Sequence, residues 1–244
     1  MVYTAFNVDC YNLENAISGA SALGFAGLNV TAPHKVHVID FIDKLDITAS
    51  SVSSINLIKY FKGESIGYNT DIYGILHALR FNGITDIRRA TIYGAGGAAR
   101  SAISALATMG CKQVSIINRT PENAANFVTQ IKEKYAIDAF VETKLSCGDI
   151  FIQASSATPA NLAGVIPKDF EAVFDMNYSK QNTWLDHLKS FNILTFDGLI
   201  MLIYQAVKSF EILWNVEVRQ DLVDELIDTL KYKNKENDKN GEKN

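Results

Sequence analysis

The sequence predicts an α/β fold in two domains, in which helices cover a parallel sheet. Strand-like and helix-like segments alternate along most of the chain, which is typical of parallel sheets. A strand-like run at 90–93 leads into a glycine-rich turn at 94–97 and then into a helix, the layout of a dinucleotide-binding unit. Two helices follow the last strand of that unit, and their apolar faces need a partner outside it. We therefore expect a Rossmann-type domain inserted into a first domain that the C-terminal helices complete.

The first half of the chain reads as a smaller α/β unit. Gly24 ends the first predicted helix, and Pro33 opens the next one at its first turn. The turn K-G-E separates the two arms of a predicted hairpin. The expected elements are a strand at 2–8, a helix at 13–23, a short strand at 26–31, a helix from Pro33, hairpin arms at 55–61 and 65–70, and a helix at about 72–81.

The second half carries the dinucleotide-binding unit and the two final helices. The expected strands are 90–93, 113–117, a weaker one at 138–142, 149–154 and 172–176; the expected helices are 98–109, 121–135, 183–191, 199–214 and 218–232. Residues 233–244 have almost no apolar side chains, so we expect a disordered tail. The chain then divides into a substrate domain of residues 1–82 plus 198–232 and a cofactor domain of residues 83–197.

Composition excludes several classes of function. The 244 residues carry a net charge of −4, which disfavours nucleic acid as a partner. No apolar run approaches the roughly 20 residues of a membrane span, and no signal peptide is recognisable. The three widely spaced cysteines favour reduced thiols in the cytoplasm, and the four histidines form no metal-binding pair. We expect a cytoplasmic protein without a metal, either a monomer or a homodimer, that acts on a small molecule.

The glycine-rich turn predicts how a dinucleotide is held. Gly94 serves the tight turn, Gly96 lets the backbone approach a pyrophosphate, and Ala99 allows close packing of helix on strand. The alternative is a glycine turn of purely structural origin. The end of the next strand separates the two interpretations.

That strand ends in Asn118, Arg119 and Thr120, where the adenosine ribose of a cofactor would lie. A carboxylate there would bind the 2′-hydroxyl of NAD, whereas a cation suits a 2′-phosphate. The sequence therefore predicts NADP as the cofactor.

Polar side chains gather at strand ends in the first half. Lys35 follows a strand and falls in the first turn of a predicted helix, where the helix dipole disfavours a cation. Asp71 lies where the second hairpin arm gives way to a helix, and Asn56 follows Ile55. A Lys beside an Asp can bind a carbonyl oxygen and deliver its proton during hydride transfer. The structural alternatives are a surface lysine, an N-cap aspartate and a turn asparagine.

The chain resembles the shikimate dehydrogenase family over about 230 residues. The matching stretches are N-V-T-A-P-H-K at 29–35, the Asn56 region, G-Y-N-T-D at 67–71, G-A-G-G-A-A-R at 94–100, N-R-T at 118–120, D-M-N-Y at 175–178 and D-G-L-I-M-L-I-Y-Q-A at 197–206. Their combination, order and spacing are highly specific.

The resemblance implies roles for individual residues. Lys35 and Asp71 would be the catalytic pair. The residues implied to contact shikimate are Thr31, Asn56, Asp71, Tyr178 and Gln205. The residues implied to contact NADP are Gly94, Ala95, Gly96, Gly97, Ala98, Asn118, Arg119, Thr120, Met176 and Gly198.

The sequence departs from the family pattern in three places. The family has a first strand and an S-x-S-P segment whose serines bind the substrate carboxylate, and this sequence contains neither. Either the start was assigned too late or that site is missing, and we expect the chain as given to bind NADP normally and shikimate weakly. The stretch I-Q-A-S-S-A-T at 152–158 replaces I-N-x-T-x-x-G, and the usual proline after Tyr178 is absent.

The resemblance implies an NADP-dependent oxidoreductase that reduces 3-dehydroshikimate to shikimate in chorismate and aromatic amino-acid biosynthesis. One alternative is a quinate/shikimate dehydrogenase, against which Arg119 argues because such enzymes often carry an acidic residue there. Another is a non-catalytic NADP-binding relative without the carboxylate site. The presence of both Lys35 and Asp71 argues against it.

Overall fold

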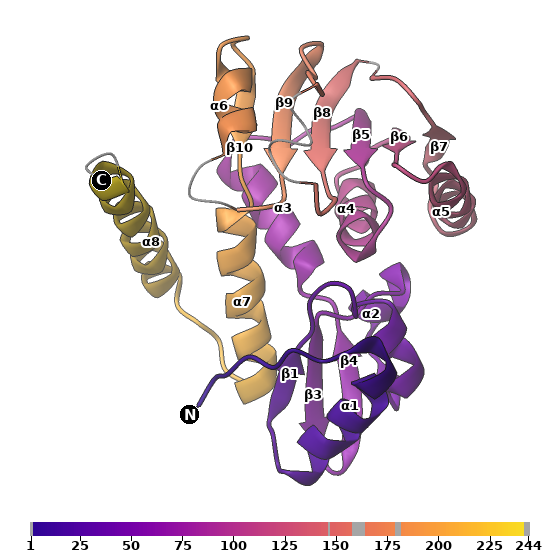
Figure 1. The fold of residues 1–244 in the computed structure, drawn as a ribbon, viewed down its shortest axis with the longest axis vertical. Coiled ribbons are helices and arrows are strands. Elements are labelled where there is room, and N and C mark those ends of the chain that lie inside the picture. The colour runs from indigo at the N-terminus through magenta and orange to yellow at the C-terminus, as the bar shows by residue number, and fades with distance from the viewer. Residues whose placement is uncertain (1, 146, 158–163, 179–181, 242–244) are drawn as a thin grey trace.

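The computed structural model describes residues 2–145, 147–157, 164–178 and 182–241, with side chains up to Leu230. The described residues form two sheets that lie in two lobes, joined by long helices that run between them (Figure 1). This confirms the α/β class and the two-domain arrangement expected from the sequence.

The lower lobe in Figure 1 is built on a four-stranded mixed sheet. Its order is β1-β3-β4-β2, with β1 antiparallel to β3, β3 antiparallel to β4, and β2 parallel to β4. The strands are β1 (Gly27–Asn29), β2 (Lys44–Leu45), β3 (Leu57–Phe61) and β4 (Glu64–Tyr68). The lobe also holds η1 (Cys10–Asn12), α1 (Leu13–Ala22), η2 (His37–Phe41) and α2 (Ile47–Val52).

The upper lobe is built on a six-stranded parallel sheet of order β10-β9-β8-β5-β6-β7. From its first strand, β5, the chain moves outward in one direction and then in the other, the doubly wound order of dinucleotide-binding folds. The strands are β5 (Arg89–Tyr93), β6 (Gln113–Ile117), β7 (Asp138–Val141), β8 (Gly148–Gln153), β9 (Phe170–Asp175) and β10 (Leu194–Phe196). The helices are α4 (Gly97–Thr108), α5 (Pro121–Lys134) and α6 (Thr183–Lys189).

Two helices carry the chain between the lobes. Helix α3 (Asp71–Phe81) begins at the lower sheet and packs along α7 (Leu199–Trp214), which descends to β3. Part of the apolar face of α7, including Ile200 and Ile203, is buried in one cluster with α3 and the core of the upper lobe, whereas Phe210 of the predicted face is 41% exposed. His77 of α3 stacks on Tyr204 of α7 with ring centroids 4.2 Å apart. Burial lowers the pKa of His77, and nearby Arg80 adds to the effect.

Most predicted elements are confirmed, and two in the first lobe are wrong. Residues 2–9 form no strand, although the ring of Phe6 meets that of Phe25. A strand needs a neighbour for its backbone groups, and none of the described residues provides one there. Residues 32–36 form turns, and the helix after Pro33 is the 3-10 helix η2. Strands β2 and β10 and helix α2 are short and were not predicted.

The expectation of a disordered tail from residue 233 is also wrong for most of its length. Helix α8 (Gln220–Gly241) continues through this segment after packing its first turns against α7. Lysine and glutamate, which are abundant there, have good helix propensity and can extend a helix that tertiary contacts have already nucleated. None of the described helices is both long enough and apolar enough to span a membrane.

Gly74 sets how closely α3 and α7 approach. A Cβ atom at this position would lie 2.5 Å from the Met201 carbonyl oxygen and 3.1 Å from the Gln205 Cβ. We expect Gly74→Ala to destabilise the protein by about 1–3 kcal/mol through overpacking, although alanine is the better helix former. Urea unfolding measures the change.

Gly19→Ala in α1 is the matched control. No heavy atom lies within 4 Å of the Cβ that this substitution would add. We expect it to stabilise the protein by up to about 1 kcal/mol through helix propensity. The same sign for both variants would show that the packing of α3 on α7 does not restrict residue 74.

Candidate active site

The site centres on a partly buried ion pair between Lys35 and Asp71. Lys35 Nζ donates to Asp71 Oδ2 at 2.6 Å, and the two side chains are 19% and 4% exposed. Lys35 lies in the turn after β1, where its carbonyl accepts from Ile55 N at 2.7 Å. Asp71 is the first residue of α3. The lysine is therefore placed by a turn and not by a helix, and the interpretation of Lys35 as a surface lysine is wrong.

Asn56 holds the second oxygen of the Asp71 carboxylate. Its Nδ2 donates to Asp71 Oδ1 at 2.9 Å, and its Oδ1 accepts from Thr70 N at 2.7 Å. Asn56 is 3% exposed, so these bonds form away from water. Both carboxylate oxygens of Asp71 thus have fixed partners, which sets the orientation of the group.

The N-cap interpretation of Asp71 is not supported by the geometry. Thr70 occupies the N-cap position of α3 without a side-chain cap bond, and Asn69 Oδ1 accepts from Ile72 N at 3.3 Å. The carboxylate of Asp71 is instead committed to Lys35 and Asn56. The Asp71 carboxylate therefore positions Lys35 and does not cap the N-terminus of α3.

The structure brings one of the other expected substrate residues into contact with the Lys35–Asp71 site and leaves two of them exposed. Gln205 of α7 accepts from Asn56 Nδ2 at 3.3 Å, so the structure brings it to the site. The side chain of Thr31 is exposed and makes no hydrogen bond within the described residues. Tyr178 is 56% exposed and likewise has no hydrogen-bond partner in the described part of the chain. Thr158, one of the noted departures, lies outside the described residues.

Sequence reasoning missed Ser209. Its Oγ lies 2.9 Å from Thr70 Oγ1 and donates to the Gln205 carbonyl at 2.8 Å. The available signal was a serine one turn beyond Gln205 in a helix that is mostly apolar. The residue connects α7 to the start of α3.

The glycine-rich turn has the geometry of a phosphate site. Gly94 has φ +126°, and a Cβ there would meet the Ala154 carbonyl oxygen at 2.9 Å. Gly96 is the N-cap of α4 and has open space where its Cβ would point, while Ala99 is fully buried. The helix N-terminus lacks a side-chain cap, so its amide groups are available to an anion. The described residues therefore fit the pyrophosphate of a dinucleotide.

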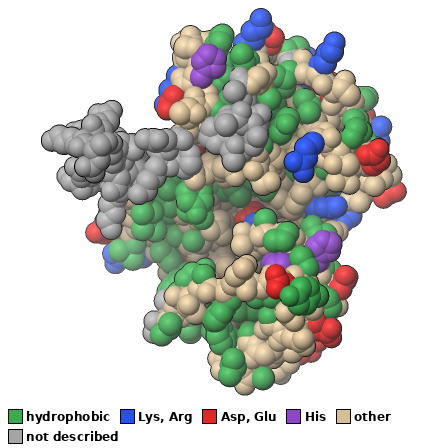
Figure 2. All heavy atoms as spheres, viewed as in Figure 1, with side chains coloured by type: hydrophobic (Ala, Val, Ile, Leu, Met, Phe, Trp, Pro, Cys, Tyr) green, Lys and Arg blue, Asp and Glu red, His purple; other side chains and the backbone are tan. Residues whose placement is uncertain are grey.

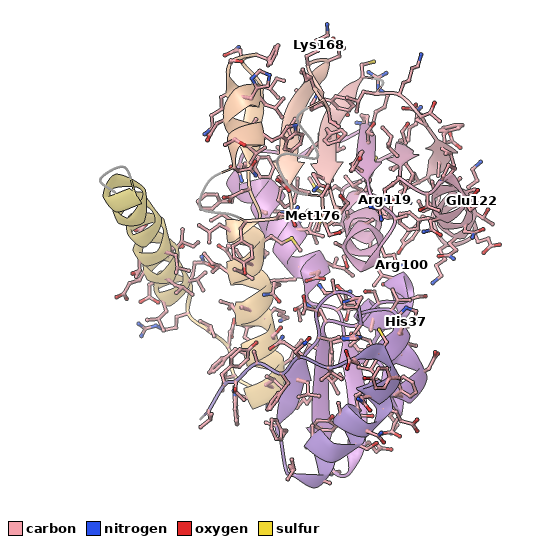
Figure 3. The ribbon with its side chains drawn as sticks, viewed as in Figure 1. His37, Arg100, Arg119, Glu122, Lys168 and Met176 are labelled. Carbon is pink, nitrogen blue, oxygen red and sulfur yellow. The ribbon has the colours of Figure 1, made fainter. Side chains whose placement is uncertain are left out.

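The end of β6 offers an unpaired cation. Arg119 is exposed and makes no ion pair or hydrogen bond within the described residues, and Asn118 Nδ2 donates to the Thr120 carbonyl at 2.9 Å. Figure 3 shows Arg119 at the edge of the six-stranded sheet that faces the lower lobe, the edge at which Met176 also lies. In doubly wound folds, ligands bind at the carboxyl ends of the strands.

Met176 and Gly198 are brought together at that edge. Met176 N donates to the Gln153 carbonyl at 3.0 Å, and Gly198 N donates to the Asn177 carbonyl at 3.0 Å. A Cβ on Gly198 would collide with the Met176 carbonyl oxygen. Burial raises the pKa of the neighbouring Asp175 carboxyl, which accepts from Asn182 and Asn177 and so fixes the turn.

The two halves of the site face each other across the hollow between the lobes (Figure 2). A Cβ on Gly97, the first residue of α4, would lie 3.2 Å from the Lys35 Cβ. A glycine-rich dinucleotide loop therefore lies directly against a lysine–aspartate pair. This arrangement defines a dinucleotide-dependent oxidoreductase.

Comparison with known proteins identifies the family. Residues 1–58 match the shikimate dehydrogenase substrate binding domain, and residues 78–173 match the shikimate/quinate 5-dehydrogenase family. An NADP⁺-type shikimate dehydrogenase of Methanopyrus kandleri is 35% identical over 240 residues, covering 88% of this chain and 80% of the relative. The corresponding enzyme of Methanocaldococcus jannaschii is 36% identical over 232 residues, covering 88% of this chain and 82% of the relative.

Solved structures agree with the sequence relatives. A crystal structure of a shikimate dehydrogenase in complex with NADP⁺ matches with a TM-score of 0.79 and 34% identity, covering 93% of this chain and 84% of that one. The Listeria monocytogenes enzyme in complex with shikimate and NAD matches with a TM-score of 0.77 and 28% identity, covering 93% and 86%. The chain belongs to the shikimate dehydrogenase family.

The bonds of Asn56 predict a stability effect. In Asn56→Ala, Asp71 Oδ1 and Thr70 N lose buried partners, and we expect a loss of about 2–4 kcal/mol in the free energy of unfolding. Asn82→Ala at the end of α3 is the control, because that partly exposed amide donates only to the Ala78 carbonyl and water can replace it. Equal losses in urea unfolding would show that Asn56 does not support Asp71.

Proposed function

We propose that this chain catalyses the reversible, NADP-dependent reduction of 3-dehydroshikimate to shikimate in aromatic amino-acid biosynthesis. The observation that carries the proposal is the Lys35–Asp71 pair lying against the first residue of the glycine-rich helix. The family membership and the NADP⁺-type relatives support the same activity. We also propose that the protein acts in the cytoplasm, as a monomer or a homodimer.

The reaction adds a hydride and a proton to a ketone. NADPH held at the glycine-rich turn would supply the hydride that the carbonyl carbon receives. Lys35 donates a proton from Nζ to the carbonyl oxygen, and in the reverse direction it takes the proton of the hydroxyl group. Asp71 holds the ammonium group in place, and Asn56 holds the Asp71 carboxylate.

The remaining residues have proposed binding roles. Shikimate contacts are assigned to Thr31, Asn56, Asp71, Tyr178 and Gln205. Cofactor contacts are assigned to Gly94, Ala95, Gly96, Gly97, Ala98, Asn118, Arg119, Thr120, Met176 and Gly198. The proposed domains are residues 1–82 plus 198–232 for the substrate and residues 83–197 for NADP.

A direct assay tests the proposed activity. Oxidation of shikimate with NADP⁺ is followed by NADPH absorbance, and quinate and NAD⁺ are run in parallel. Turnover with quinate and NAD⁺ exceeding that with shikimate and NADP⁺ would favour the quinate/shikimate dehydrogenase alternative. NADP⁺ binding without turnover of either substrate would favour a non-catalytic relative.

Lys35 is expected to dominate the chemical step. Lys35→Ala removes the proton donor, and we expect kcat to fall by about 10²–10⁴-fold with little change in the Kd for NADP⁺. Asp71→Asn, which removes the charge but keeps the shape, is expected to lower kcat as well. Lys44→Ala is the control, because Lys44 pairs with Glu64 on the surface of the same lobe. Near-normal kcat in Lys35→Ala would exclude the assigned role.

Arg119 is expected to select NADP over NAD. Charge-assisted bonds to the 2′-phosphate predict a roughly ten- to hundred-fold weaker Kd for NADP⁺ in Arg119→Ala, with the Kd for NAD⁺ nearly unchanged. Lys112→Ala, at the opposite end of β6, removes a similar charge away from the site. If Arg119→Ala weakened both cofactors equally, Arg119 would have a structural role.

A further inference from the structure

Ser54 carries a hydroxyl group that has no partner among the described residues. The residue is fully buried between α2 and β3, and its Oγ makes no hydrogen bond within the described part of the chain. Buried hydroxyl groups in native proteins are normally paired, because an unpaired one loses its bonds to water without compensation. An exception at this position needs an explanation.

The hydroxyl group faces the helix that starts the dinucleotide site. A Cβ on Gly97, with which α4 begins, would lie 2.9 Å from Ser54 Oγ and 3.2 Å from Lys35 Cβ. The serine and the catalytic lysine therefore lie side by side against the same turn. The Ser54 hydroxyl group therefore lies against the first residue of the helix whose N-terminus would bind an anion.

The position of Ser54 is fixed by its neighbours. Asn69 Nδ2 donates to the Ser54 carbonyl at 3.0 Å, and Ser101 Oγ of α4 donates to Asn69 Oδ1 at 3.2 Å. Ser101 Oγ also lies 3.2 Å from the Gly97 carbonyl oxygen. This chain of buried bonds ties the backbone of Ser54 to the first turns of α4, so the residue is positioned beside this helix before any ligand binds.

We propose that the Ser54 hydroxyl donates a hydrogen bond to a phosphate oxygen in the nicotinamide half of NADP. The uncapped amide groups of α4 and the helix dipole attract an anion there, and the hydroxyl adds a donor from the other lobe. Because Ser54 lies beside Lys35, its contact falls on the reactive side of the cofactor, away from Arg119. The proposal rests on the proposed function, since it needs NADP at the glycine-rich turn.

Ser54→Ala gives this role a signature that a structural serine would not give. The substitution removes an unpaired buried hydroxyl, so we expect the Tm of the cofactor-free protein to stay the same or rise. We expect the Kd for NADP⁺ to weaken by about ten- to hundred-fold, as for a hydrogen bond to a charged group. The Kd for 2′,5′-ADP, which lacks the nicotinamide half, stays unchanged.

Calorimetry with each ligand and thermal unfolding without ligand make the test on the full chain. Ser51→Ala, in the same segment, is the matched control, because its Oγ donates only to the Thr48 carbonyl. Arg119→Ala serves as the complementary variant, since it should weaken both NADP⁺ and 2′,5′-ADP.

Three results of these measurements would contradict the proposed role of Ser54, and a fourth would contradict the proposed function. Unchanged NADP⁺ affinity in Ser54→Ala, or a loss of Tm in the cofactor-free protein, would overturn the proposal and make the serine structural. Equal weakening of NADP⁺ and 2′,5′-ADP would also overturn it, because the contact would not lie in the nicotinamide half. Failure of the unsubstituted chain to bind NADP⁺ would overturn the proposed function itself.

Discussion

The partly buried ion pair between Lys35 and Asp71 is the interaction around which the site is organised. A carboxylate removed from water, as that of Asp71 is, is tolerated only when its remaining hydrogen-bonding capacity is met. Asp71 meets this condition through Asn56, and Asn56 in turn accepts from the backbone of Thr70. One ion pair thus determines which polar side chains must be buried around the start of α3.

The same constraint explains why the lower lobe and the long helices must fit closely. Asn56 Nδ2 also lies 3.3 Å from Gln205 Oε1, and Ser209 Oγ lies 2.9 Å from Thr70 Oγ1. Hydrogen bonds from two residues of α7 therefore fix this helix against the start of α3. Gly74 allows the backbone of α7 to approach α3 on the next turn. Packing and hydrogen bonding therefore set the same helix–helix distance, and a change in one would disturb the other.

The upper lobe contributes the turns at the carboxyl ends of its parallel strands. Its parallel strands end at one edge, where the turn after β5 presents Gly94, the turn after β6 presents Arg119, which has no partner among the described residues, and the turn after β9 presents Met176. These turns are held by backbone bonds, by the side chains of Asn118 and Asp175, and by the absence of side chains at Gly94 and Gly198. The proposed function uses the upper lobe to hold the cofactor at this edge and the lower lobe to supply the reacting side chains.

The sequence by itself determined the fold class and the glycine-rich turn, and it predicted Lys35, Asp71 and Arg119 as candidate site residues, because these features can be recognised in local patterns. Strand periodicity, a required positive φ at Gly94 and a cation at a strand end can all be recognised within a few residues. Long-range pairing decided the rest. Residues 2–8 have a strand-like composition but no strand beside them, and Lys35 is placed by a turn that pairs with Ile55. The bonds of Asn56 to α3 and α7, and the unpaired hydroxyl of Ser54 against Gly97, join segments far apart in sequence, so only the tertiary structure could reveal them.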